Sequence, residues 1–176
     1  HGAEGIKRAV RAGARSIEHG SLMDDEAIAL MKQHGTFLVA DIYNGDYIDS
    51  VGRRDGWSAE ILRKNLDTTE AQREDFRKAV VAGVNIAYGT DSGVYPHGDN
   101  ARQFAYMVRY GMTPLQAIRA ATLESARLLR KENELGSITP GKLADLVALA
   151  CDPLADIACL QQVRGVVKAG VPVALD

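Results

Sequence analysis

The chain has 176 residues and a formal net charge of −2, and its 46% hydrophobic and 25% charged residues are ordinary for a globular protein that buries one core. This charge balance argues against a nucleic-acid partner or an anionic membrane surface, because both require clustered Lys and Arg. No apolar run approaches the roughly 18 to 20 residues of a membrane span. The two cysteines, Cys151 and Cys159, indicate neither a disulfide nor a compartment by themselves. Because the chain begins with His1 rather than Met, its localisation stays open.

Helix-like and strand-like segments alternate over the first 41 residues. Residues 3–14 carry small and apolar side chains at spacings of three and four, which predicts a helix, and residues 15–18 follow as a short strand. Two acidic residues suit the first turn of a second helix over residues 26–33. Residues 36–41 are β-branched, aromatic and apolar, which predicts a buried strand.

The middle of the chain is less regular. Residues 42–57 contain three glycines and are expected to form an irregular loop, of a length that is usually functional or disordered. A long charged helix is predicted over residues 58–82, followed by a strand over residues 84–88. Residues 92–99 then form a Gly- and Pro-rich loop.

The C-terminal part changes character. Two helices are predicted, one over about residues 100–110 and one from Thr113, where a capping residue precedes proline at the first helical position. Three short strands follow at residues 145–149, 165–168 and 171–175, and they are typical of a separate small β layer.

The order of these elements predicts an α/β fold. Three strand–helix repeats imply parallel strands joined by right-handed crossovers. Three such units cannot close a barrel of eight, so as a stand-alone protein the chain looks incomplete.

Two potential metal ligands follow predicted strands. His19 comes directly after residues 15–18, and Asp91 comes soon after residues 84–88. In a parallel α/β barrel such strand ends converge on one face, and histidine nitrogen with aspartate oxygen is what a catalytic divalent metal requires. Taken singly, His19 could equally be a hydrogen-bonded core residue and Asp91 a cap or turn residue. The pattern alone leaves both interpretations open.

Four other side chains are candidates for the same site. His1 precedes the first helix and could be a metal ligand, a substrate hydrogen-bond donor or a chain end without a native role. Tyr43 and Tyr47 follow a predicted strand, where a phenol could polarise a substrate carbonyl or bind a carboxylate, or simply pack with its hydroxyl in water. His97 could line the pocket, although we expect it to be too exposed for a ligand.

Four motifs in this order resemble the C-terminal half of the amidohydrolase superfamily. They are Ile17-Glu18-His19-Gly20, Tyr88-Gly89-Thr90-Asp91-Ser92-Gly93, Gly111-Met112-Thr113-Pro114-Leu115-Gln116-Ala117-Ile118-Arg119-Ala120-Ala121-Thr122, and Leu135-Gly136-Ser137-Ile138 with Gly141-Lys142-x-Ala144-Asp145-Leu146. The stretches that begin at Asp41 and His97 resemble, more narrowly, the branch of zinc carboxypeptidases and Xaa-Pro dipeptidases. Related hydrolases split the amide bond of ochratoxin A. The resemblance covers essentially the whole chain.

The resemblance implies a (β/α)8 barrel with a small β-sandwich built from both ends of the polypeptide. Residues 1–134 would be the C-terminal half of the barrel, and residues 135–176 would be strands of the sandwich. The family's first-strand histidine pair and its carboxylated lysine are not in this sequence. We therefore expect the chain alone to be inactive and its partner to be the N-terminal half of the same enzyme. We also expect the whole enzyme to be a homo-oligomer.

The resemblance also assigns roles in a binuclear centre with two zinc ions. His19 matches the ligand after strand six and Asp91 the ligand after strand eight, whereas His1 falls in the strand-five region as either a ligand or a substrate contact. A metal-bridging hydroxide would attack the amide, with Asp91 also shuttling the proton, Tyr43 stabilising the oxyanion and His1 orienting the substrate. Tyr43, Tyr47 and His97 are the expected substrate-binding residues.

The implied function is hydrolysis of an amide that releases a C-terminal amino acid from dipeptides or N-acyl amino acids, including ochratoxin A-type amides. Two alternatives remain. One is a cyclic-amide hydrolase resembling imidazolonepropionase, or a deaminase, of the same superfamily. The other is an inactive binding or oligomerisation fragment.

Overall fold

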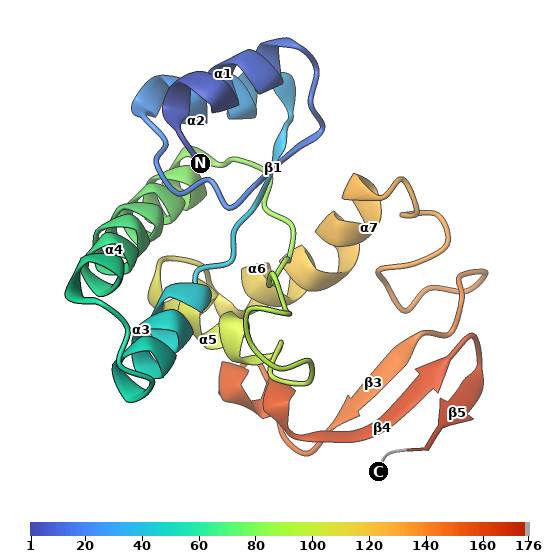
Figure 1. Ribbon diagram of the computed structural model, residues 1–176. Helices are drawn as coiled ribbons and strands as arrows, with labels where there is room; N and C mark the ends of the chain where they lie inside the picture. The colour runs from blue at the N-terminus through green and yellow to red at the C-terminus, as the bar shows by residue number, and fades with distance from the viewer. Residues whose placement is uncertain (175–176) are drawn as a thin grey trace.

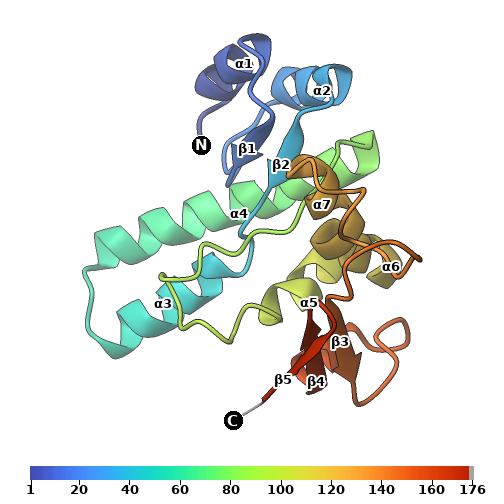
Figure 2. The same cartoon turned by 90° about the vertical axis from the view of Figure 1, so that its right-hand side faces the viewer.

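The computed structural model of the protein describes residues 1–174 (Figure 1). Leu175, the expected end of the last strand, and the final residues of the expected domain over 135–176 lie outside the described residues. Two sheets are present among the described residues, and Figures 1 and 2 both place the antiparallel one at the opposite end of the molecule from helices α1 (Ala3–Arg11) and α2 (Asp25–His34).

Parallel segments lie side by side in the order in which they occur in the chain. Strand β1 (Ser16–Glu18) pairs in parallel with β2 (Phe37–Val39). Two isolated parallel bridges add a segment on each side of this pair, one between Gly2 and Leu22 and the other between Leu38 of β2 and Ile86. Together these segments form what we call the parallel row. The strand expected over residues 84–88 is thus reduced to one bridge at Ile86. This parallel order confirms the α/β class, and the helices between the segments are the expected crossovers.

Local capping signals define the two helices that flank this row. In α2 the Asp24 side chain accepts a hydrogen bond from the Ala27 amide at 2.8 Å. Helix α4 (Ala59–Ala82) begins with the Ser58 hydroxyl as its cap and ends at Gly83, whose φ is 79°. Phe76 of α4 is 1% exposed and lies in the same apolar core as the fully buried side chains of α1, α2 and β2, namely Val10, Met31 and Leu38.

The segment expected to be an irregular loop over residues 42–57 is largely helical, and that expectation was wrong. Helix α3 (Asn44–Arg54) packs antiparallel beside α4 (Figure 2). Its glycines are close-approach positions, because a Cβ at Gly45 would overlap Thr69 and one at Gly52 would overlap Leu62. Packing between the two helices therefore offsets the low helix propensity of glycine.

A second helical run follows the site-bearing loops. Helix α5 (Arg102–Arg109) precedes α6 (Pro114–Arg119), a π-helical turn (Ala120–Glu124) and α7 (Ser125–Leu128). The carbonyl oxygen of Ala120 accepts bonds from the Tyr88 amide at 3.2 Å and the Ser125 hydroxyl at 2.7 Å. The π-helical turn thereby holds the segment that leads to Asp91.

The C-terminal residues form a small antiparallel sheet. It contains β3 (Leu146–Leu149), β4 (Val163–Lys168) and β5 (Val171–Val173), in that order. A 3₁₀-helix (Ile157–Gln161) joins β3 to β4, and a disulfide between Cys151 and Cys159 closes this connection. The sheet and the α6–α7 run line an apolar groove of about 1060 Å³. Within residues 1–174, no helix is long and apolar enough to cross a membrane.

Candidate metal centre

The two predicted ligands both lie on left-handed backbone. His19 follows β1 with φ of 66°, and Asp91 follows Gly89-Thr90 with φ of 50°. Residues other than glycine rarely adopt this conformation, although His and Asp adopt it more readily than most. Residues held in such strained backbone conformations cluster at functional sites. Both side chains reach the carboxyl-terminal edge of the parallel row because of this turn in the backbone.

Glycine and glutamine set the position of the Asp91 loop. A Cβ at Gly89 would overlap the Val39 side chain, so only glycine lets this segment lie against β2. The fully buried Gln103 side chain donates hydrogen bonds through Nε2 to the carbonyl oxygens of Gly89 and Ala40, the latter at 2.7 Å. One amide group thus connects the ends of two neighbouring segments.

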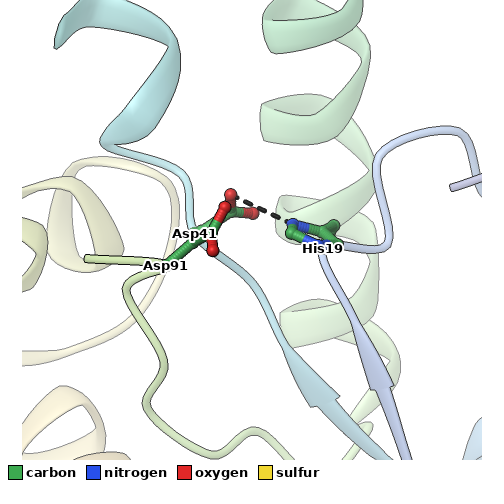
Figure 3. Close-up of side chains that lie close together, drawn as sticks. All are labelled: His19, Asp41 and Asp91. Atoms are coloured by element: carbon green, nitrogen blue, oxygen red, sulfur yellow. Dashed lines mark ion pairs between the residues drawn. The ribbon is translucent and has the colours of Figure 1, made fainter. Parts of the chain in front are cut away.

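Three side chains converge at this edge. The ligand atoms of His19, Asp41 and Asp91 all lie within 4.8 Å of one another, and Figure 3 shows them coming from three separate segments. His19 Nδ1 is 3.1 Å from Asp41 Oδ2, Asp91 is exposed, and Asp41 is 8% exposed. An imidazole nitrogen with carboxylate oxygens is a donor set that fits a divalent cation such as zinc.

Asp41 is the residue that the sequence reasoning left out of the site. The strand predicted over residues 36–41 ends at Asp41, so Asp41 stands at a strand end much as His19 and Asp91 do. In the structure Asp41 accepts hydrogen bonds from Gln72 Nε2 and Asn44 Nδ2, each at 2.7 Å. The rule that polar side chains converge at parallel strand ends would have found it.

His1 lies beside the cluster. Its ring stacks on that of His19, with centroids 4.7 Å apart and planes inclined by 24°, and its Nδ1 is 2.9 Å from the Ser21 hydroxyl. The structure therefore brings His1 and His19 together, while His1 is not one of the three grouped donors.

Tyr43 and Tyr47 belong to an aromatic cluster next to Asp41. The Tyr43 ring is buried, with centroids 4.9 Å from Tyr95, 5.2 Å from Tyr106 and 6.5 Å from Tyr47. Burial raises the pKa of Tyr106 to about 12, and its hydroxyl donates to Asp46 at 2.6 Å. The Tyr106 phenol is therefore protonated and acts as a hydrogen-bond donor at neutral pH.

His97 stands apart from these groups. It is exposed on the loop after Asp91 and does not belong to the group of His19, Asp41 and Asp91.

Known proteins are similar to this chain over most of its length. A solved Xaa-Pro dipeptidase with methionine bound in its active site is 47% identical, with a TM-score of 0.92, over 98% of this chain and 43% of that chain. Ochratoxinase from Aspergillus niger is 36% identical over 168 residues, which are 94% of this chain and 34% of that protein. An imidazolonepropionase from Nocardia farcinica is 32% identical over 152 residues, or 85% of this chain and 33% of that protein.

The chain thus spans less than half the length of these relatives. Its residues 1–173 match the family model described as "Amidohydrolase family". The chain therefore belongs to the amidohydrolase family.

Proposed function

We propose that this chain supplies the C-terminal half of the active site of a metal-dependent amide hydrolase. The observation that carries the proposal is the convergence of His19, Asp41 and Asp91 at one edge of a parallel row. Similarity to a Xaa-Pro dipeptidase and to ochratoxinase supports a substrate whose amide bond links a C-terminal amino acid to a peptide or acyl group. The product is then a free amino acid.

His19 and Asp91 would hold the divalent metal, with His1 as a further candidate ligand. We propose zinc, with two ions in a complete active site. When bound, the metal supplies Lewis-acid polarisation of the amide carbonyl and lowers the pKa of water.

The protein's own groups then divide the remaining chemistry. The exposed Asp91 carboxylate accepts the proton of the attacking water and delivers it to the leaving amine. The Tyr43 hydroxyl donates a hydrogen bond to the oxygen on which negative charge develops. His1 orients the substrate, while Tyr47 and His97 contact the part of the substrate away from the reacting bond.

The remaining ligands would come from the N-terminal half of a longer polypeptide. The relatives are more than twice as long as the matched region, which supports this division. In this proposal residues 1–134 complete a (β/α)8 barrel, residues 135–176 join N-terminal strands in a small β-sandwich, and the whole enzyme is a homo-oligomer. Residues 1–176 alone should show no turnover.

Replacing Asp91 with Asn in the complete protein tests the proposal. Losing the proton shuttle should lower kcat by about 10²- to 10⁴-fold while the fold is retained, because an amide cannot carry the proton. Turnover is measured as free amino acid released from a panel of Xaa-Pro dipeptides and N-acyl amino acids, with bound metal quantified in the same samples.

Asp99→Asn is the matched control. Asp99 pairs with Arg102 at 3.2 Å and lies outside the cluster, so its loss should leave kcat near that of the wild type. Wild-type turnover retained in Asp91→Asn would refute the shuttle role.

The similarity to imidazolonepropionase favours a second candidate, hydrolysis of a cyclic amide or a related deamination. The same substrate panel separates the two. The first proposal predicts a free amino acid from a linear amide, whereas the second predicts ring opening or ammonia release. An unreactive protein without metal would instead indicate a binding or oligomerisation role.

A further inference from the structure

We infer that Asp41 is a positioning residue that fixes the tautomer of His19, with Gln72 and Asn44 holding Asp41 in place. The inference rests on the proposed function, since it takes His19 to be a metal ligand. It gives a role to Asp41, Asn44 and Gln72, three buried polar side chains that take no part in the proposed chemical steps.

The first step of the argument concerns the proton on His19. Asp41 Oδ2 lies 3.1 Å from His19 Nδ1, which places the carboxylate in direct electrostatic contact with that ring nitrogen. A carboxylate oxygen is an acceptor with no proton to donate, so the contact is attractive when Nδ1 carries the proton and repulsive when Nδ1 presents its lone pair. In the neutral ring the other nitrogen, Nε2, then presents its lone pair, which is the form that binds a metal.

The second step concerns the restraint on Asp41 itself. Its Oδ1 accepts from Gln72 Nε2 and its Oδ2 from Asn44 Nδ2, each at 2.7 Å. Both oxygens are therefore engaged by amide donors, and the side chain is nearly buried, whereas Asp91 is exposed. A carboxylate held in this way is suited to orient a neighbour, and the exposed one is suited to exchange protons with substrate.

The third step concerns Gln72, in the middle of α4. Its Nε2 donates to Asp41 and also to the carbonyl oxygen of His19 at 3.0 Å. Both partners are acceptors, so the amide must present its NH₂ group to them, and its orientation is fixed. One side chain thus holds the left-handed backbone of His19 and the carboxylate that faces its ring. The histidine is set in place before any metal binds.

The test uses the complete protein labelled with ¹⁵N-histidine. In the metal-free wild type, the ¹⁵N shifts of His19 should report a proton on Nδ1. In Asp41→Asn that preference should be lost, and zinc affinity measured by competition with a chelating dye should fall by roughly 10- to 100-fold. Gln72→Leu keeps Asp41 but removes its donor, so a smaller fall in affinity is expected, and this variant covers the case in which Asp41→Asn does not fold.

Asp75→Asn provides the matched control. Asp75 is a buried carboxylate on α4, the helix that carries Gln72, and it accepts a hydrogen bond from the Met23 amide. The Asp75→Asn variant should therefore keep the zinc affinity and the His19 tautomer of the wild type. An unchanged tautomer in Asp41→Asn overturns the inference even if zinc affinity falls, because Asp41 would then act directly as a ligand. A changed tautomer with zinc affinity within about twofold of the wild type overturns it too. A wild type that binds no zinc refutes the proposed function instead, and the ¹⁵N shifts still report on the Asp41 contact.

Discussion

At the scale of single residues, the lack of a side chain at Gly89 allows the close packing that positions Asp91, the proposed proton shuttle. The segment carrying Asp91 lies so close to β2 that a methyl group at position 89 would overlap Val39. The neighbouring carbonyl oxygens of Gly89 and Ala40 are held by the same Gln103 amide. A shift of the Gly89 backbone is therefore transmitted to Asp91 two residues later.

Gly89→Ala should accordingly lower both stability and activity. Overpacking at this contact is expected to cost about 1 to 3 kcal/mol of unfolding free energy, and a displacement of Asp91 by about 1 Å can reduce kcat by roughly 10²-fold. Urea denaturation and amino-acid release measure the two effects.

Gly5→Ala is the control, because Gly5 lies in α1 with no atom within 4 Å of an added Cβ. It should leave kcat unchanged and raise stability by about 0.5 to 1 kcal/mol. If Gly89→Ala behaves like Gly5→Ala, the close approach to Val39 has no role in placing Asp91.

Strand ends in the sequence pointed to two of the three clustered side chains, and Asp41 was the one left out although it too ends a predicted strand. His19 and Asp91 each follow a segment predicted to be a strand, and the structure brings their side chains together. Gln72 could not be found this way, since it sits inside a continuous charged helix and its partners are 53 and 31 residues away in the chain. Contacts of that separation depend on how the elements pack, which no local pattern contains.

At the scale of elements, α4 is joined to the start of α2 by a buried carboxylate. Asp75 Oδ2 accepts the Met23 amide at 2.9 Å, just before the Asp24 cap. Burial raises the pKa of Asp75 above its usual 3.8, with the Met23 hydrogen bond and Lys78 opposing the shift. The folded state therefore holds the Asp75 proton to a higher pH than the unfolded chain does.

This shift predicts a pH-dependent difference between the wild type and Asp75→Asn. Between about pH 4 and the raised pKa the folded state binds more protons at this site, so the stability contribution of Asp75 falls as pH rises. Asparagine keeps an oxygen for the Met23 amide and does not titrate. The stability of Asp75→Asn relative to the wild type should thus increase from pH 4 to pH 7 in urea denaturation series. A constant or decreasing difference would contradict the raised pKa.

Helices with local capping signals were predicted from the sequence, whereas the helix that depends on packing against another element was not. The starts of α2 and α4 are marked by Asp24 and Ser58, which cap them as residues of this type commonly do. Helix α3 was missed because Gly45 and Gly52 indicate breaks when considered locally. The two glycines allow side chains of α4 to pack closely against α3, and this contact cannot be read from the local sequence.

At the scale of the whole molecule, the small sheet presents apolar side chains without a covering layer among the described residues. Val147 is 59% exposed and Ile138 is 90% exposed, and both line the groove between the sheet and the α6–α7 run. Apolar patches of this kind mark surfaces that associate with other chain segments. The proposed N-terminal strands would cover this face.

Val147→Lys tests that arrangement. In the complete protein the loss of a buried valine should reduce stability by about 1 to 2 kcal/mol, whereas residues 1–176 alone should become more soluble. Val81→Lys is the control, since Val81 is 82% exposed at the end of α4, away from the groove. Thermal melts and sedimentation of both forms give the comparison. Equal stability of the two lysine variants in the complete protein would refute the covered face.

The length of α4 has a consequence for how the site can be tuned. The helix runs unbroken from its Ser58 cap to Gly83, and Gln72 lies 14 residues from that cap, or roughly 21 Å along the axis. Because Gln72 donates to both Asp41 and the His19 carbonyl oxygen, a substitution that displaces α4 would also displace these two groups. In the proposed metal centre, substitutions on the outer turns of α4 would then be a route to adjusting metal affinity that leaves the proposed ligands unchanged.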